Sequence, residues 1–183
     1  MILASQSPRR KELLSLIQDE FVVMPADIDE SVLSGERPDV FVERLAKTKA
    51  ETVAKQVDFD ETVIAADTAV AVDGLILNKP IDWSDFQFMM SRLSGRTHQV
   101  YTGVCVLSAG VIKQAVVCTD VTLRAITAEE QADYWASGEP SDKAGGYGIQ
   151  GRAARFVAHI KGSYTNVVGL PLVELEALLT DAT

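Results

Sequence analysis

Runs of apolar residues predict a protein built from strands and helices in alternation. The buried strands that these runs predict lie at about residues 1–5, 62–66, 97–107, 111–124 and 155–160. Within residues 70–77 (VAVDGLIL), the central Asp-Gly pair predicts a hairpin turn. The run 62–66 ends at Asp67, so we expect that carboxylate at the end of its strand.

Helical spacing of apolar residues, with capping and stop signals around it, predicts five helices. They are expected to begin near residues 8, 39, 82, 128 and 171. Residues 127–130 (TAEE) have the pattern of a capping box, and Gly138 predicts the end of that helix. Helices mixed with hairpins favour an α/β fold with a mixed sheet, and Lys79-Pro80 is the best candidate for a boundary between two lobes.

Composition narrows the class of protein. The chain has 183 residues, of which 47% are hydrophobic, which is enough for a sizeable core. Its net charge of −9 argues against general binding to nucleic acid or to an anionic membrane. No uncharged stretch is long enough to cross a bilayer, the N-terminal pattern is unlike a signal peptide, and Cys105 and Cys118 suit reduced thiols, so we expect a cytoplasmic protein.

The first helix carries a candidate anion site. Ser7 is the expected N-cap, and Arg9 and Arg10 follow in the first turn. Cations oppose the helix dipole at this end, so their presence suggests an anion such as phosphate between them and the free N–H groups. The alternative is a solvated first turn with two surface arginines.

Lys49 falls in the middle of an apolar helical stripe. Taking about 100° per residue, it lies between Leu45 and Val53 on the inward side, whereas Lys47 and Lys55 point away. An inward ammonium needs an anionic partner or an opening into a cleft. The alternative is a lysine whose stem lies along the core edge and whose charge reaches water.

Asp67 and Thr68 form a third candidate, because ligands bind at strand ends in open α/β sheets. A carboxylate there could hold Mg²⁺ or accept a proton from water, or it could simply turn the chain. Weaker candidates are Glu30, Lys79 and Gln150, the last in a glycine-rich loop that permits close backbone approach to a ligand. The chain lacks the ligand spacing of a zinc site and the phosphate-binding loop of P-loop NTPases.

Eight stretches, in order along the chain, resemble the Maf-like family of nucleoside triphosphate pyrophosphatases. They are SQSPRR (5–10), DIDE (27–30), RLAKTKA (44–50), AADT (65–68), NKP (78–80), LSGRTHQVYTG (93–103), SGEPSDKAGGYGIQG (137–151) and GSYTNVVGLPLVE (162–174). The resemblance covers essentially the whole chain, so a single Maf-like domain over residues 1–183 is expected. It implies a two-lobed α/β body with a long mixed sheet, flanking helices and a central cleft, similar to the inosine triphosphate pyrophosphatases.

The resemblance also implies an activity and a set of site residues. The expected reaction is hydrolysis of a nucleoside triphosphate to the monophosphate and pyrophosphate with a divalent metal cation, Mg²⁺ or Mn²⁺. The residues that match the catalytic charges of the family are Asp67, Glu30, Lys49 and Lys79. Asp67 and Glu30 are the expected metal ligands. The residues expected to bind substrate are Ser7, Arg9, Arg10, Thr68 and Gln150.

Within the family, Arg9, Thr68 and Gln150 resemble the subtype that acts on dTTP and UTP. Asn78 stands where an acidic residue or glycine is common, beside the expected catalytic Lys79. Two alternatives stay open: a house-cleaning hydrolase for modified pyrimidine triphosphates, and a non-enzymatic nucleotide-binding regulator of cell division. The resemblance further implies a homodimer, since relatives often form one.

Overall fold

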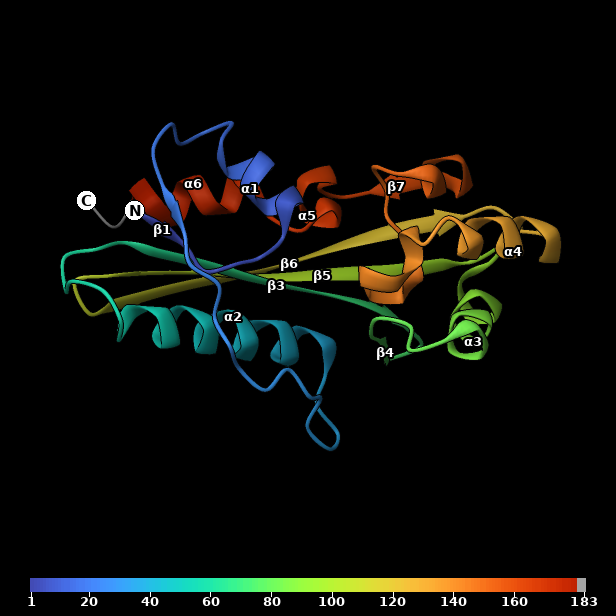
Figure 1. Ribbon diagram of the computed structural model, residues 1–183, viewed down its shortest axis with the longest axis horizontal. Helices are drawn as coiled ribbons and strands as arrows, with labels where there is room; N and C mark the ends of the chain where they lie inside the picture. Colours follow the sequence, from blue (N-terminus) through green and yellow to red (C-terminus); the bar gives the residue numbers. More distant parts are fainter. Residues whose placement is uncertain (181–183) are drawn as a thin grey trace.

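Three long strands extend along the molecule and form the centre of one sheet (Figure 1). The structure, a computed structural model, describes residues 1–180. The long strands are β3 (Val63–Val72), β5 (Thr97–Ser108) and β6 (Val111–Leu123). Shorter strands complete the sheet: β1 (Ile2–Leu3), β2 (Val22–Val23), β4 (Leu75–Leu77) and β7 (Val157–Lys161).

The sheet is mixed, as the sequence predicts. The strand order is β2-β1-β3-β5-β6-β7, and β4 pairs with β3. Strand β1 runs parallel to both β2 and β3, whereas the other pairs are antiparallel. The Asp73-Gly74 turn between β3 and β4 confirms the predicted hairpin, and the strands predicted at 97–107 and 111–124 form a second, longer hairpin as β5 and β6.

Helices cover both faces of the sheet (Figure 1). The helix on one face is α2 (Pro38–Ala54). On the other face lie α1 (Pro8–Leu14), α5 (Tyr164–Val168) and α6 (Leu172–Thr180). The far end carries α3 (Trp83–Leu93), α4 (Ala128–Ala136) and the 3₁₀ turns η1 (Glu139–Asp142), η2 (Ala144–Gly146) and η3 (Arg152–Phe156). This arrangement confirms the predicted α/β class with flanking helices.

Side-chain caps begin the helices where the sequence predicts. The Ser7 hydroxyl accepts a hydrogen bond from the backbone N–H of Arg10 at the start of α1. Asp82 accepts one from the N–H of Asp85 at the start of α3. Thr127 and Glu130 form the capping box of α4. These bonds satisfy N–H groups that a helix end otherwise leaves unpaired.

The prediction that the strand ends at Asp67 is wrong. Strand β3 continues to Val72, and Asp67 lies near its middle, paired with Gly103 of β5. The strand continues because apolar residues follow Asp67 and Thr68 on both faces, and all four residues 69–72 are buried. The polar pair thus interrupts an otherwise apolar strand, and its side chains need partners or an opening on each face.

One edge of β3 has a gap at this polar pair. Strand β1 pairs with Val63 and Ile64, and β4 pairs with β3 from Val70 onward. Among the described residues, no strand pairs with residues 65–69 on this edge. A ligand at the gap can therefore reach side chains from both faces of one strand.

Candidate active site

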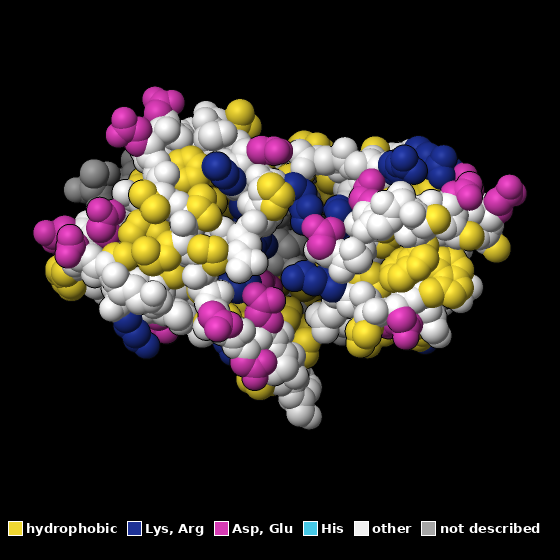
Figure 2. Space-filling model, in the orientation of Figure 1, with side chains coloured by type: hydrophobic (Ala, Val, Ile, Leu, Met, Phe, Trp, Pro, Cys, Tyr) yellow, Lys and Arg dark blue, Asp and Glu magenta, His cyan; other side chains and the backbone are white. Residues whose placement is uncertain are grey.

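A cleft of about 720 Å³ opens at the gap in the edge of β3. Figure 2 shows dark-blue Lys and Arg side chains around a hollow at the centre of this face, with carboxylates beside them. All nine residues expected from the sequence to form the site line this cleft: Ser7, Arg9, Arg10, Glu30, Lys49, Asp67, Thr68, Lys79 and Gln150. They come from segments far apart in the sequence, which the fold brings together.

Lys49 joins the two expected catalytic carboxylates. Its Nζ lies 2.6 Å from Oδ1 of Asp67 and 2.6 Å from Oε1 of Glu30. Lys49 and Asp67 are each only 7% exposed. Lys49 is therefore paired inside the cleft rather than reaching bulk water, and Asp67 is an inward-facing strand residue rather than a turn residue.

Close packing of α2 on the sheet places Lys49 at this depth. A Cβ added at Gly103 would overlap the backbone carbonyl of Val42, so glycine lets the helix backbone approach the strand directly. Gly103 lies opposite Asp67 in the β3–β5 pair. Lys49 lies about two helical turns beyond Val42 on α2, where it meets the carboxylate of Asp67.

The two carboxylates differ in protonation behaviour. Burial raises the pKa of Asp67, although Lys49 and Arg10 partly offset the effect. Burial would also raise the pKa of Glu30, but its hydrogen bond to Lys49 and the nearby charges of Lys49, Lys79 and Arg10 lower that pKa overall. Glu30 is an ionised group at the surface, whereas Asp67 lies deeper, where charge is costlier.

Arg10 is held on the opposite face of β3. Its Nε donates to the Gly169 carbonyl at 2.8 Å, Nη1 to Ser5 Oγ at 3.3 Å, and Nη2 to Thr68 Oγ1 at 3.0 Å. Burial lowers the pKa of Arg10, with the carboxylate of Asp67 acting against that shift. An arginine stays protonated in proteins, so the guanidinium provides a fixed positive charge.

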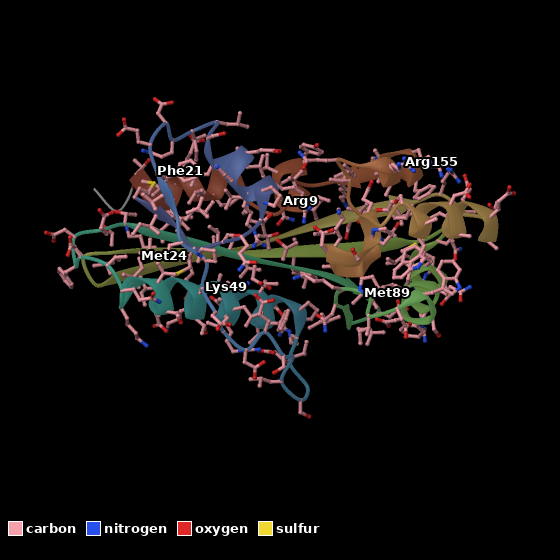
Figure 3. The ribbon with its side chains drawn as sticks, in the orientation of Figure 1. Arg9, Phe21, Met24, Lys49, Met89 and Arg155 are labelled. Carbon is pink, nitrogen blue, oxygen red and sulfur yellow. The ribbon has the colours of Figure 1, made fainter. Side chains whose placement is uncertain are left out.

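The remaining expected residues stand at the mouth of the cleft. Arg9 lies on the α1 side and Lys49 on the α2 side in Figure 3. Nη1 of Arg9 is 3.6 Å from Oδ2 of Asp142. Lys79 and Gln150 are exposed, and within residues 1–180 neither side chain makes a salt bridge or a hydrogen bond. Their polar ends are free to contact a ligand.

The cleft also contains residues that the sequence analysis did not assign to it. Lys143 lines it beside Asp142, and its Nζ donates to Asp142 Oδ1 at 2.6 Å and to the Glu139 carbonyl at 2.8 Å. Its position at the start of the glycine-rich loop could have indicated that Lys143 lines the cleft, but the sequence pattern pointed more strongly to the glycines and to Gln150. Asp142 thus lies between two cations, Arg9 and Lys143.

Tyr147 is another cleft residue from that loop. Its hydroxyl lies 2.6 Å from Nε2 of His98, a fully buried histidine of β5. Burial lowers the pKa of His98 to about 4, so the imidazole is neutral at neutral pH. The pair ties the glycine-rich loop to the sheet, and nothing in the sequence indicated that these two residues meet.

The carboxylates fit a divalent cation that is shared with a ligand. Within the described part of the chain, no group of three or more His, Cys, Asp or Glu side chains could hold a metal ion by itself. Asp67 and Glu30 meet at Lys49 and provide two carboxylates in one cleft. Mg²⁺ commonly binds one or two protein carboxylates and completes its shell with phosphate oxygens and water.

Fold and site together define an α/β protein with a central cleft lined by arginine and lysine side chains and by two carboxylates. The family model described as Maf-like protein matches residues 1–182, and the chain belongs to this family. A relative from Pseudoalteromonas atlantica, named dTTP/UTP pyrophosphatase, is 49% identical over 98% of this chain and 95% of its own. Another with that name, from Pseudoalteromonas translucida, is 50% identical over 97% and 94% of the two chains.

A solved structure shows a similar fold. The Ham1 protein of Staphylococcus aureus superposes with a TM-score of 0.50 and 17% sequence identity, covering 67% of this chain and 70% of its own. This likeness supports the architecture predicted from the sequence. Separately, none of the helices in residues 1–180 has both the length and the apolar character that crossing a membrane requires.

Proposed function

We propose that this protein hydrolyses dTTP and UTP between the α- and β-phosphates, releasing the nucleoside monophosphate and pyrophosphate. The observation that carries the proposal is the meeting of Arg9, Arg10, Lys49 and Lys79 with two carboxylates in one cleft. The chain has a net charge of −9, so this local concentration of cations requires a reason. A triphosphate supplies one, and the relatives of about 50% identity named dTTP/UTP pyrophosphatase support it.

The side chains divide the reaction between them. Arg9, Arg10 and Lys79 would bind phosphate oxygens and stabilise the negative charge that develops on the departing pyrophosphate. A water oxygen forms the new bond to the α-phosphorus, the bond from that phosphorus to the bridging oxygen breaks, and one of the two carboxylates accepts the proton of the water. Lys49 holds both carboxylates in place through its two ion pairs.

Asp67 and Glu30 would hold the divalent cation, Mg²⁺ or Mn²⁺. When bound, the cation polarises phosphate oxygens and lowers the pKa of water in the cleft. Oδ1 of Asp67 is bound to Lys49, and among the described residues Oδ2 makes no hydrogen bond, so this oxygen is available as a ligand. The pairing with Lys49 keeps the carboxylates from separating when the cation is absent.

Recognition of the base would fall to the mouth of the cleft, where Gln150 is exposed. The 4-oxo group and N3–H of uracil or thymine need one donor and one acceptor, which a glutamine amide provides. Cytosine presents the reverse pattern, so a nucleotide complex that holds the amide in one orientation would leave polar groups unpaired with CTP and reject it. UTP and dTTP differ only by a methyl and a hydroxyl group, so both should react.

The test is a substrate panel with purified protein. Pyrophosphate release is measured with UTP, dTTP, CTP, GTP and 7-methyl-GTP, each with Mg²⁺ and with Mn²⁺, and kcat/KM is compared. We expect UTP and dTTP to be preferred at least about tenfold. Preference for CTP or 7-methyl-GTP would overturn the base assignment alone. Tight nucleotide binding without pyrophosphate release would instead favour the nucleotide-binding regulator.

A further inference from the structure

A chain of hydrogen bonds extends from Arg10 in the cleft along one face of the sheet to α5. Its first link is the 3.0 Å bond from Arg10 Nη2 to Thr68 Oγ1. Thr68 Oγ1 lies 2.9 Å from Thr102 Oγ1 of β5, its partner across the strand pair. The Thr102 hydroxyl lies 3.0 Å from the carbonyl of Asn166 in α5. Thr102 and Asn166 are fully buried.

The direction of each hydrogen bond follows from the number of hydrogens. A carbonyl only accepts, so the single hydroxyl hydrogen of Thr102 goes to Asn166. Thr102 therefore accepts in its contact with Thr68, whose own hydrogen is donated to Thr102. Thr68 is left as the acceptor for Arg10, which has only donors. Each hydroxyl in the chain thus has its one hydrogen already committed, and Thr68 has none to offer a ligand.

Asn166, at the α5 end of these linked hydrogen bonds, is itself held by further bonds to the sheet. The Asn166 side chain donates through Nδ2 to the Val100 carbonyl at 3.0 Å and to Thr119 Oγ1 at 2.9 Å. Thr119 Oγ1 also accepts from the Ser163 N–H at 3.0 Å and lies 3.3 Å from the Ser163 carbonyl. These bonds fix the short helix α5 to β5 and β6. Helix α5 lies in the stretch 162–174, in which the family resemblance predicted no site residue.

Helix α5 also returns to Arg10 at its C-terminal end. Gly169 follows α5 with φ of +122°, and its carbonyl accepts the 2.8 Å bond from Arg10 Nε. A Cβ at Gly169 would lie 3.4 Å from Thr68 Oγ1 and 3.6 Å from Arg10 Nε. Helix α5 thus holds Thr102 through the Asn166 carbonyl and also gives the Arg10 guanidinium an acceptor, the Gly169 carbonyl, at its C-terminal end.

We propose that Thr102 and Asn166 are positioning residues that fix the Arg10 guanidinium for binding of a polyphosphate. With Ser5, Thr68 and Gly169 as acceptors, three of the five N–H groups of Arg10 are engaged within the protein. Two remain, one on each Nη, for phosphate oxygens. The planar fork is thereby held in one orientation before the ligand binds, which reduces the entropy lost on binding.

Replacing Thr102 by Val tests this proposal, which rests on the proposed function. Valine keeps the shape and removes the hydroxyl, so the Thr68 hydroxyl loses the partner that orients it and one of the three contacts of the Arg10 guanidinium is weakened. We expect kcat/KM for UTP to fall about tenfold, and Thr102→Ser to restore it. The matched control is Thr122→Val, which removes a hydroxyl from another cross-strand threonine pair, the 2.7 Å contact of Thr97 and Thr122 far from Arg10. Activity of Thr102→Val within twofold of the parent would overturn the proposal.

A double-mutant cycle separates positioning of Arg10 from general loss of structure. Arg10→Lys replaces the fork by a point charge that cannot make the three contacts at once. If Thr102 acts through Arg10, adding Thr102→Val to Arg10→Lys should change kcat/KM less than twofold. A further tenfold loss in the double mutant would show that Thr102 acts by another route.

Binding of inorganic pyrophosphate keeps the proposal testable if no nucleotide is hydrolysed. Calorimetry on the intact protein should give a Kd for pyrophosphate about tenfold weaker in Thr102→Val than in the parent or in Thr122→Val. An unchanged Kd would overturn the positioning of Arg10. A weakened Kd without any pyrophosphate release from nucleotides would support the positioning and reject only the proposed reaction. If Thr102→Val does not fold, Thr68→Val removes the neighbouring link and takes its place in the same measurements.

Discussion

Asp67 and Thr68 are neighbours on β3, yet they meet different chemistry on the two faces of the strand. Asp67 faces α2, where it contacts the ammonium of Lys49 and, through it, Glu30. Thr68 faces α1 and α5, where its partners are Arg10 and another threonine hydroxyl. The alternation of a strand produces this separation, since successive side chains point to opposite faces.

The two faces therefore stabilise charge in different ways. On the α2 face, buried charges are paired with each other, so removing one leaves the others uncompensated. On the α5 face a single cation is surrounded by neutral acceptors, so removing one acceptor weakens an orientation without leaving a buried charge alone. Substitutions on the α2 face should cost more in activity and in stability.

Asp67→Asn should have the largest effect. Shape is kept while charge and basicity are lost, so kcat for UTP should fall by a factor on the order of 10² to 10⁴. The fold should persist because Lys49 keeps its ion pair with Glu30. Pyrophosphate release and circular dichroism are the measurements, and Asp73→Asn at the exposed turn after the same strand is the control. Activity within a few-fold of the parent would remove Asp67 from the chemistry.

Lys49→Met should lower stability as well as turnover. On the sequence alone, replacing an inward ammonium by an apolar side chain is expected to preserve or raise stability, but the two ion pairs reverse that expectation. The substitution leaves Asp67 buried without its cation, which should cost about 3–5 kcal/mol in the free energy of unfolding. Adding Asp67→Asn should recover most of that loss.

Urea unfolding of the single and double variants measures the difference. Lys47→Met, on the exposed side of the same helix, is the control and should change stability by less than about 0.5 kcal/mol. If Lys49→Met were as stable as the parent, the ion pairs on the α2 face would not contribute to stability. The proposed difference between the α2 and α5 faces would then be wrong.

Most of the fold could be predicted from the sequence because its elements carry strong local signals. The caps at Ser7, Asp82 and Thr127 and the apolar runs of the long strands are such signals. The two-residue strand β2 and the five-residue helix α5 were missed, since elements this short have no measurable period. Their structure depends on partners elsewhere in the chain, such as Thr119 for Asn166.

In the site, too, some features could be predicted from the sequence and others depend on tertiary structure. Helical spacing predicted that Lys49 points inward, and the family resemblance predicted which residues share a cleft. Neither could reveal that Lys49 contacts both carboxylates, or that Thr68 is committed to Arg10 and Thr102. These contacts depend on strand register and on the depth at which α2 packs, which are set by tertiary structure.

Gly103→Ala tests whether that depth matters. The added methyl would overlap the Val42 carbonyl, so α2 has to move away from the sheet, which should cost about 2 kcal/mol in the free energy of unfolding. The shift also separates Lys49 from Asp67, so turnover should fall more than pyrophosphate binding at Arg10 on the other face. Urea unfolding, kcat and calorimetric Kd together measure this. An equal loss on both faces would show that the sheet itself is distorted.

Thr68→Val should have the smallest effect and sharpens the comparison most. The hydroxyl hydrogen of Thr68 is donated to Thr102, so Thr68 has no hydrogen to offer the base, and we expect it to act by holding Arg10. We expect kcat/KM to fall about tenfold for UTP, dTTP and CTP alike, with Thr68→Ser close to the parent. The ratio of UTP to CTP should therefore stay constant in the variant, whereas Gln150→Ala should reduce it. A change in that ratio for Thr68→Val would place the threonine against the base, because only a direct contact distinguishes a carbonyl from an amino group at the same ring position.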